Sequence, residues 1–373
     1  MQLSKITAIA IIASSMVQAE NYVNVEFLQY DESDSRVSVS APSISMSYDI
    51  GTDYNIKADF VHDAVSGATP SWKSDTASGA SAKGDSNGDY SYGKQEFDEA
   101  RNAGSVLLTT RFDNRDELYT GVDFSRESDF DSKTISAEYM HYSDSSHNQS
   151  ITAGASYTYN EILSYDYYDT GSGASQKKTS TTINAELGLN QVLDAKSSVK
   201  VSGFVLSDDG YLTNAHASVI RNYKDINKRK QTSENRPDTR LGYGADIKYI
   251  RLLTDNLSYQ VDYRFYDDDW DISSHTINND IYYKATDKLT LGAGVRYYTQ
   301  TEAKFYNSSK DFFTNEEFAS SDERLSDFDA LTYKANVNYK FSDKISVNLG
   351  GEFYTQSTGL DATMITTGIK YKY

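Results

Sequence analysis

Apolar and polar side chains alternate over segments of about ten residues, and this period of two limits the fold more than any other feature. From Leu241 to Tyr249, every odd-numbered residue is apolar or aromatic, whereas the even-numbered residues are Gly, Asp or Lys. Leu257–Phe265, Leu289–Tyr297 and Leu331–Phe341 repeat the pattern. Such segments are longer than the roughly five or six residues of an average soluble strand and are typical of transmembrane β-strands.

The first residues predict export. Lys5 supplies a positive start, Ile6–Val17 is a short apolar core, and Val17-Gln18-Ala19 offers small residues for cleavage. We therefore expect a signal peptide over residues 1–19 and a barrel over residues 20–373. No later segment has about eighteen consecutive apolar residues, so no transmembrane helix is expected. Within lipid, only a closed barrel lets strands pair every backbone group.

Aromatic residues and the C-terminus favour the same fold. The chain has 31 Tyr and 15 Phe but only 3 Pro and no Cys, which suits strands and excludes disulfides. Tyr and Phe recur at strand ends, as expected for girdles at the two lipid–water interfaces. The alternating segment Thr363–Tyr373 ends on an aromatic residue. It resembles the sorting signal that outer-membrane barrels present to the barrel-insertion machinery, which is therefore an expected partner.

Connections alternate between short and long. Short turns are centred on Asp255, Asp287 and Asp343, and we expect them in the periplasm. Long polar connections are expected outside the cell, at residues 64–103, 161–178, 207–238 and 303–328. Bacterial barrels show this asymmetry.

The strand number must be even if both termini lie in the periplasm. Counting every plausible segment gives an odd number. Placing Tyr211–Tyr223 in the loop that ends at Asp238 restores parity. The prediction is an all-β, antiparallel, up-and-down transmembrane barrel of about sixteen strands. Its least regular strands are the first two, Tyr22–Tyr30 and Arg36–Ile50, where Pro42 interrupts the pattern.

The faces opposite the apolar ones carry both signs of charge, and we expect them to line the lumen. The members of this set are Lys57, Asp59, Asp123, Glu138, Glu186, Lys200, Arg240, Asp246, Lys248, Asp262, Arg264, Asp280, Arg296, Lys334, Lys340 and Glu352. Two interpretations stay open. The wall is a polar conduit with some charge selectivity, or it is an ion-paired lining that braces the barrel.

The net charge of −18 becomes −18 − 1 = −19 once the segment with Lys5 is removed. Such a surface repels phosphate, so no nucleic-acid partner is expected. The acidic loops are expected to contact outer-membrane lipid and lipopolysaccharide, with divalent cations as bridges. One loop segment has the spacing of a calcium loop, at Asp85, Asn87, Asp89 and Glu96, although Tyr90 stands where that loop has Gly.

The run Asp267–Asp271 contains four carboxylates at a tight hairpin. They repel one another unless a cation or an arginine joins them. The favoured alternative is a solvated turn whose Trp270 sits at the membrane interface.

No catalytic group is evident, and we expect no enzyme. The five His are scattered, and there is no phosphate-binding glycine loop. A barrel lipid hydrolase would need Ser and His on the lipid-facing wall. His275 lies beside Ser273 and Ser274, but no third member of a triad is apparent.

Four stretches, across nearly all of the mature chain, resemble the outer-membrane family called domain of unknown function 3570. They are Asp63–Pro70, Asp209–Asn214, Arg236–Arg240 and Asp268–Thr276. The chain departs from the family at Asp271, where Gly is expected, and at Ala215-His216, where Asn-Pro or Asp-Pro is expected. The resemblance implies a barrel. Similar proteins are often encoded near a periplasmic flavin transferase and a small lipoprotein, so the resemblance also implies a periplasmic partner that belongs to an export or redox-linked system.

The shared stretches lie at the loop ends of predicted strands and suggest a structural or ligand-facing cluster. Its expected members are Asp63, Ser66, Asp209, Tyr211, Arg236, Asp238, Asp268, Asp269, Trp270 and His275. Three functions follow as hypotheses: a channel or transporter for a small polar solute, an occluded structural or partner-docking barrel, and a lipid hydrolase.

Overall fold

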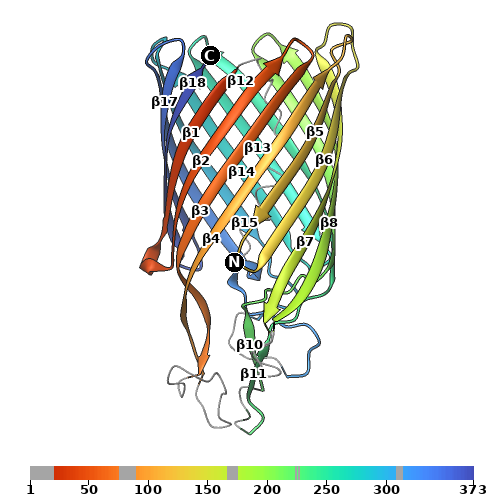
Figure 1. The fold of residues 1–373 in the computed structure, drawn as a ribbon, viewed down its shortest axis with the longest axis vertical. Helices are drawn as coiled ribbons and strands as arrows, with labels where there is room; N and C mark the ends of the chain where they lie inside the picture. The colour runs from red at the N-terminus through yellow and green to blue at the C-terminus, as the bar shows by residue number, and fades with distance from the viewer. Residues whose placement is uncertain (1–20, 75–89, 166–174, 223–224, 226, 308–313) are drawn as a thin grey trace.

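The computed structural model describes residues 21–74, 90–165, 175–222, 225, 227–307 and 314–373. Sixteen antiparallel strands form a closed barrel, as predicted (Figure 1). They are β1 Tyr22–Glu32, β2 Val37–Ile50, β3 Tyr54–Ser74, β4 Tyr90–Arg111, β5 Glu117–Arg126, β6 Phe130–Tyr142, β7 Gln149–Tyr165, β8 Ser175–Asp194, β9 Ser197–Gly210, β12 Thr239–Thr254, β13 Leu257–Asp268, β14 Ser273–Lys284, β15 Leu289–Gln300, β16 Phe328–Lys340, β17 Ile345–Gln356 and β18 Asp361–Lys372. Among these residues, no helix is long and apolar enough to cross a bilayer.

The barrel closes between its first and last strands. β1 pairs with β18 from Tyr22 opposite Lys372 to Glu32 opposite Ala362. An even number of strands brings the start of β1 and the end of β18 to one end of the barrel, which we call the terminal end. The opposite end, which carries the long connections, is the loop end (Figure 1). Closure leaves no strand edge unpaired, which is the condition for crossing lipid.

The two least regular strands of the sequence do form. Pro42 lies in β2 opposite Phe27 of β1. On the other side of β2, the paired positions run from Ser40 opposite Ala64 directly to Ser43 opposite Val61. Proline has no N–H to donate, so the interruption in pairing falls where the donor is missing.

Faces follow the alternation in the sequence. Large apolar side chains such as Leu187 and Ile135 point outward and are 62% and 61% exposed, which suits contact with lipid. At the terminal end, exposed aromatic rings stack or meet edge to face, with Tyr339 and Phe341 4.9 Å apart and Tyr371 and Tyr373 6.4 Å apart. These rings are placed as expected of an interfacial girdle.

Two predicted loops are partly strand. β3 and β4 continue past the barrel as a two-stranded ribbon that reaches Ser74 opposite Tyr90, within the predicted connection 64–103 (Figure 1). β7 and β8 likewise extend to Tyr165 opposite Ser175. Beyond the lipid, neither face of a ribbon must be apolar. The alternation that marks a membrane strand is therefore absent there, and the sequence pattern understates strand length.

The described residues of the connection between β9 and β12 lie outside the barrel wall, as predicted for the segment that begins at Tyr211. They form a small hairpin of β10 Ser218–Arg221 and β11 Lys230–Ser233, paired only with each other. Two 3₁₀ turns, η3 Ser33–Ser35 and η4 Glu323–Leu325, lie in the connections β1–β2 and β15–β16.

Candidate functional site: the loop core and the lumen wall

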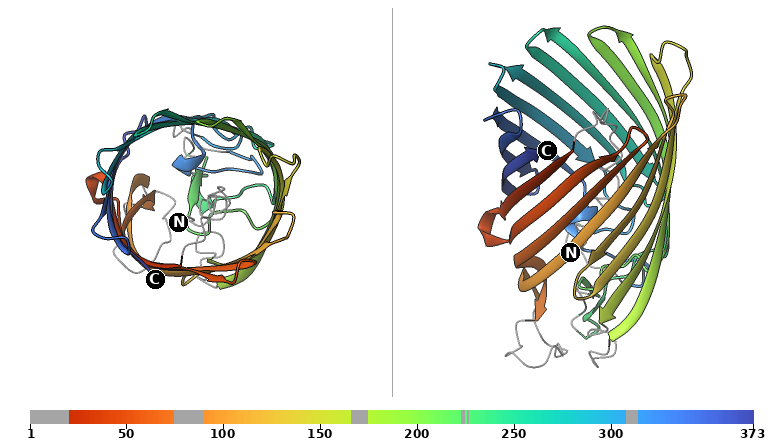
Figure 2. Two further views of the ribbon diagram at one scale, coloured as in Figure 1. Left: turned by 90° about the horizontal axis from the view of Figure 1, so that it is seen from above. Right: turned by 45° about the horizontal axis from the view of Figure 1, so that its top comes forward.

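Three connections meet at the loop end: residues 211–238, the tight turn 269–272 and the described residues of 301–327. The β10–β11 hairpin of the first lies beyond the barrel rim in Figure 1 and within the barrel outline seen along the axis in Figure 2. The connections share a buried apolar cluster, which we call the loop core. Its members are Leu212, Trp270, Ile272, Ala303, Phe305 and Leu325. The loop core fixes these connections across part of the lumen mouth.

Trp270 is the largest side chain of the loop core and is only 3% exposed. Its indole N–H donates to the carbonyl of Thr239 at 2.9 Å, and its ring meets Phe305 edge to face at 5.0 Å. The expectation of a solvated turn with Trp270 at the membrane interface is therefore wrong. The apolar partners that bury it come from distant connections, which no local pattern reveals.

The acidic run around Trp270 is held by separate donors. Asp268 accepts from Nε of Arg240 at 2.7 Å, from the hydroxyl of Tyr266 at 2.8 Å and from two backbone amides. Asp267 accepts from the hydroxyl of Tyr243, and Asp269 from the amide of Leu241. An arginine thus joins the run at its most buried member, as electrostatics requires.

Asp271 completes this turn with a positive φ of 68°. That backbone conformation favours glycine, because a Cβ crowds the following carbonyl. The position is the one at which the family resemblance led us to expect Gly.

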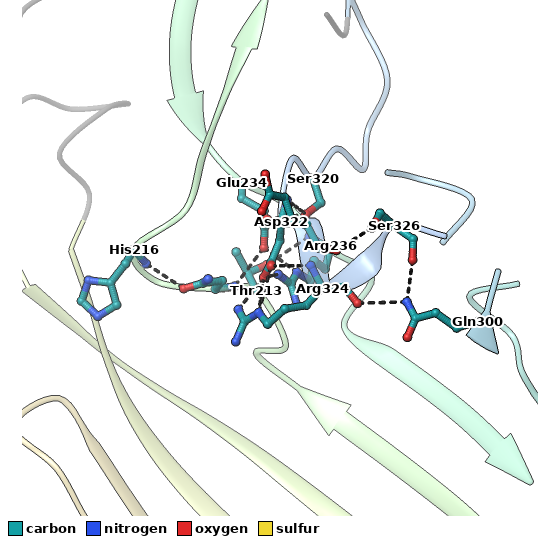
Figure 3. A network of polar contacts seen from close by, with 11 residues as sticks. Thr213, His216, Glu234, Arg236, Gln300, Ser320, Asp322, Arg324 and Ser326 are labelled. Carbon is teal, nitrogen blue, oxygen red and sulfur yellow. Dashed lines mark hydrogen bonds and ion pairs between the residues drawn. The ribbon is translucent and has the colours of Figure 1, made fainter. Parts of the chain in front are cut away.

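A network of polar and charged side chains next to the loop core joins two of its connections (Figure 3). It consists of Glu234, Arg236, Ser320, Asp322 and Arg324, and we call it the loop network. Arg236 bridges the two connections: it pairs with Glu234 on its own loop and donates to Asp322 at 2.7 Å on the other. Ser320 donates to Glu234, and Arg324 pairs with Asp322. Burial alone would raise the pKa of Asp322, but Arg324 and Arg236 outweigh it and hold that pKa well below its usual range.

The structure brings together only part of the predicted cluster. Asp268 and Trp270 belong to the turn at the loop core. Arg236 reaches that core through Asp322, the N-cap of η4, because η4 contains Leu325. Asp269 is exposed at the rim of the turn.

The other predicted members lie elsewhere. Asp63 accepts from Nε of Arg101 at 2.6 Å on the β3–β4 wall, and Ser66 is exposed nearby. The Tyr211 hydroxyl lies 3.0 Å from Oγ of Ser164. Asp209 and Asp238 are exposed. The ring of His275 contacts the rings of Tyr263 and Phe265 on the outer face of the barrel.

The predicted lumen residues between Asp246 and Glu352 lie on inward positions of β12–β17, whereas Asp59 and Asp123 lie on β3 and β5. Cross-strand register places Asp246 opposite Arg264, Lys248 opposite Asp262 and Lys334 opposite Glu352. Arg264 and Asp246 form an ion pair at 3.6 Å. Lys334 pairs instead with Asp280, also at 3.6 Å, across Gly294 of the intervening strand β15. Arg296 lies over the ring of Tyr298 at 5.4 Å. This half of the wall therefore matches the ion-paired lining.

The other half of the wall contains a cavity of about 350 Å³, which we call the lumen recess. One row of inward residues crosses it, each paired in register with the next: Asp59, Ser105, Asp123, Thr134, Thr158, Thr182, Asp208 and Arg240. The sequence pattern identified Asp59, Asp123 and Arg240 as inward residues, but Asp208 and the hydroxyl members of the row were missed. Short polar residues on inward positions were the available signal, yet only the register shows that they form one row.

Three carboxylates gather on the outer rim of the loop end. Oxygens of Glu99, Glu127 and Asp129 lie within 4.8 Å of one another, and Nε2 of His216 lies 2.5 Å from Asp129. Burial and then Glu99 raise the pKa of Glu127 to about 7. The predicted calcium-loop side chains, Asp85, Asn87, Asp89 and Glu96, lie outside the described residues.

A closed antiparallel barrel with an apolar exterior and a polar lumen defines a transmembrane β-barrel protein. The chain belongs to the family described as "Protein of unknown function (DUF3570)", whose sequence model matches residues 4–368. The resemblance seen in the sequence is thereby confirmed. No curated protein matches the chain by sequence.

Solved structures with a similar fold are distant in sequence. A mutant of the ferric enterobactin receptor PfeA of Pseudomonas aeruginosa, in complex with enterobactin, is 11% identical with a TM-score of 0.47 over 91% of this chain and 54% of the receptor. OmpT of Vibrio cholerae lacking loop L8 is 12% identical, with a TM-score of 0.45 over 95% and 98% of the two chains. OpdK of Pseudomonas aeruginosa, solved with vanillate, is 7% identical with a TM-score of 0.44 over 95% and 98%. This chain thus spans about half the length of the siderophore receptors it matches.

Proposed function

We propose that this protein is a channel of the bacterial outer membrane for small polar solutes. The observation that carries the proposal is the lumen recess, a cavity of about 350 Å³ in a polar wall beside the loop core. Tyr266 lines the recess and also packs on the loop core, so the cavity borders the narrowed mouth. Ligand sites in proteins are commonly cavities of roughly 300–1,000 Å³.

The proposal includes a direction across the membrane. The signal peptide takes the chain to the periplasm, and the insertion machinery recognises its C-terminal strand. The terminal end then faces the periplasm, and the acidic loop end faces outward among lipopolysaccharide. The short turns at the terminal end and the long connections at the other end support this orientation.

The charged lining of the lumen supports a selective channel rather than a wide, unselective pore. On β12–β17, opposite charges pair across strands and occupy the wall. The lumen recess on β3–β9, β12 and β13 instead combines short hydroxyl and amide side chains, such as Ser132 and Asn160, with apolar ones such as Phe130 and Leu206. A solute would pass along this less filled side. The proposal assigns no catalytic step to the chain.

The loop core favours a second candidate, a barrel that is closed at its mouth and docks a periplasmic partner. Its buried side chains and the loop network hold three connections together over the lumen. Connections held together over the lumen in this way are compatible with a closed, partner-docking barrel as well as with a selective channel.

Single-channel recording separates the two candidates. The detergent-folded protein is first checked by gel migration before and after boiling, which shifts for an intact barrel. Stepwise conductance in planar bilayers supports the channel. A heat-shifted but silent protein overturns the channel and leaves the docking barrel. Release of fatty acid from phospholipid vesicles, abolished by His275→Ala, would replace both with a hydrolase.

A further inference from the structure

The lumen recess is built by three adjacent rows of inward residues on β3–β9. The central row places Ser105 between Asp59 and Asp123, one on each neighbouring strand. Strands lie about 4.8 Å apart, so the two carboxylates start roughly 10 Å apart and face the same cavity. Ser105 donates to Asp59 at 3.3 Å. One end of the recess is therefore lined by two carboxylates.

The cations of the recess are already engaged by other carboxylates. Arg101 pairs with Asp63, and Arg240 pairs with Asp268. Lys57 lies 3.7 Å from Asp59. Within the described part of the chain, the Asp123 carboxylate has no hydrogen bond or ion pair. A carboxylate beside a cavity and without a cation favours a positively charged ligand.

A second polar atom of the recess also lacks a partner. Oγ of Ser125, two residues from Asp123 on the same face of β5, is buried and makes no hydrogen bond among the described residues. Buried polar atoms are normally paired, with protein, water or ligand. A bound group with a donor or acceptor would satisfy this hydroxyl.

The remaining wall suits a compact ligand body. Thr134 and Thr158 hydrogen-bond to each other at 2.8 Å, and Thr182 donates to Asp208 at 2.5 Å, so these hydroxyls are partly occupied within the wall. Phe130 and Leu206 add apolar surface. A ring-sized body would contact methyl groups and the aromatic ring rather than a further set of charges.

We propose that the lumen recess binds a small solute that carries a protonated amine, with the ammonium at Asp123 and the compact body against the threonine row and Phe130. This inference rests on the proposed channel and names the class of solute that it favours. An anion of the same size would meet an unpaired carboxylate. A neutral solute would leave that carboxylate without a counter-charge.

The test uses three probes of one size: benzylamine, benzyl alcohol and benzoate. Their binding to detergent-folded protein is measured by calorimetry at neutral pH. A charge-assisted hydrogen bond contributes about 1.5–3 kcal/mol, so benzylamine should bind at least about tenfold more tightly than benzyl alcohol. Benzoate should bind most weakly.

Variants place the effect at one residue. Asp123→Asn should reduce benzylamine affinity to that of benzyl alcohol, and Asp123→Glu should retain the preference. Glu352→Gln is the matched control, because Glu352 is a lumen carboxylate on β17 outside the recess. Heat-shifted gel migration confirms that each variant is folded.

The outcomes separate this inference from the channel proposal. Equal binding of the three probes, or benzylamine binding that survives Asp123→Asn, overturns the amine site even if the protein conducts. Asp123-dependent benzylamine binding in a protein without conductance supports the site and overturns the channel. Benzylamine block of conductance that Asp123→Asn relieves supports both.

Discussion

Removing the guanidinium of Arg236 should release the loop end while the barrel stays intact. Its side chain is 11% exposed, and it bridges Glu234, which is fully buried, to Asp322, which is 9% exposed. In Arg236→Met, Asp322 keeps Arg324, but Glu234 loses the arginine it contacts directly and keeps Arg324 only as a more distant charge. Breaking a buried ion pair in this way costs about 3–5 kcal/mol. Because Glu234 keeps hydrogen bonds from Ser320 and the amide of Asn214, we expect the lower value.

About 3 kcal/mol corresponds to a roughly hundredfold larger population of open loop. Hydrogen exchange measures this directly at the amides that join the two connections, Asn235 to Ala319 and its reverse. Their exchange should accelerate by about that factor, whereas amides in β12–β18 should not change. Local opening of this kind is independent of global unfolding.

Two control variants test whether the effect is specific to the Arg236 ion pairs. Arg221→Met removes an arginine of the same connection that donates to the carbonyl of Glu316 and lies near its exposed carboxylate, so it should change exchange little. The double variant Glu234→Gln with Arg236→Met removes the orphaned charge and should recover part of the protection. Unchanged exchange in Arg236→Met, or equal acceleration throughout the barrel, would refute the assigned role.

Three further predictions concern the same end of the barrel. Trp270→Ala removes the main side chain of the loop core, a loss of about 3–5 kcal/mol for a buried aromatic, and should raise single-channel conductance; unchanged conductance would show that the loop core does not narrow the path. Asp271 has a positive φ of 68°, so Asp271→Gly should stabilise the turn by on the order of 1 kcal/mol and slow its hydrogen exchange, whereas Asp271→Val should speed that exchange. Faster exchange in the Gly variant than in the Val variant would show that the turn is not strained. The pKa of Glu127 is raised from 4.5 to about 7, so between pH 4.5 and 7 the folded loop binds a proton that the unfolded loop does not bind. The stability of the folded loop should therefore fall as the pH rises from 4.5 to 7. In Glu127→Gln, pulsed proteolysis of the loop should lose that dependence, and a retained slope would assign it to another group.

The amino-acid sequence is enough to specify the barrel and the faces of its strands. A strand in lipid must turn one face to hydrocarbon and the other to the lumen. The alternation of apolar and polar residues therefore determines which side chains point to the lipid and which to the lumen. This is why the alternation alone places Asp246, Arg264 and Lys334 on the inner wall. The even number of strands follows from placing both termini in the periplasm, and this parity assigns Tyr211 to a connection.

How those residues meet depends on the tertiary structure. The burial of Trp270 requires Phe305 and Leu325, which lie on another connection, and no local pattern encodes that contact. The β3–β4 ribbon beyond the lipid lacks alternation, because both of its faces lie outside the membrane. The row from Asp59 to Arg240 exists only through register, since a shift by one residue would turn each strand's inward set outward. Side-chain direction is a local property of a strand, whereas a cavity is a property of its neighbours.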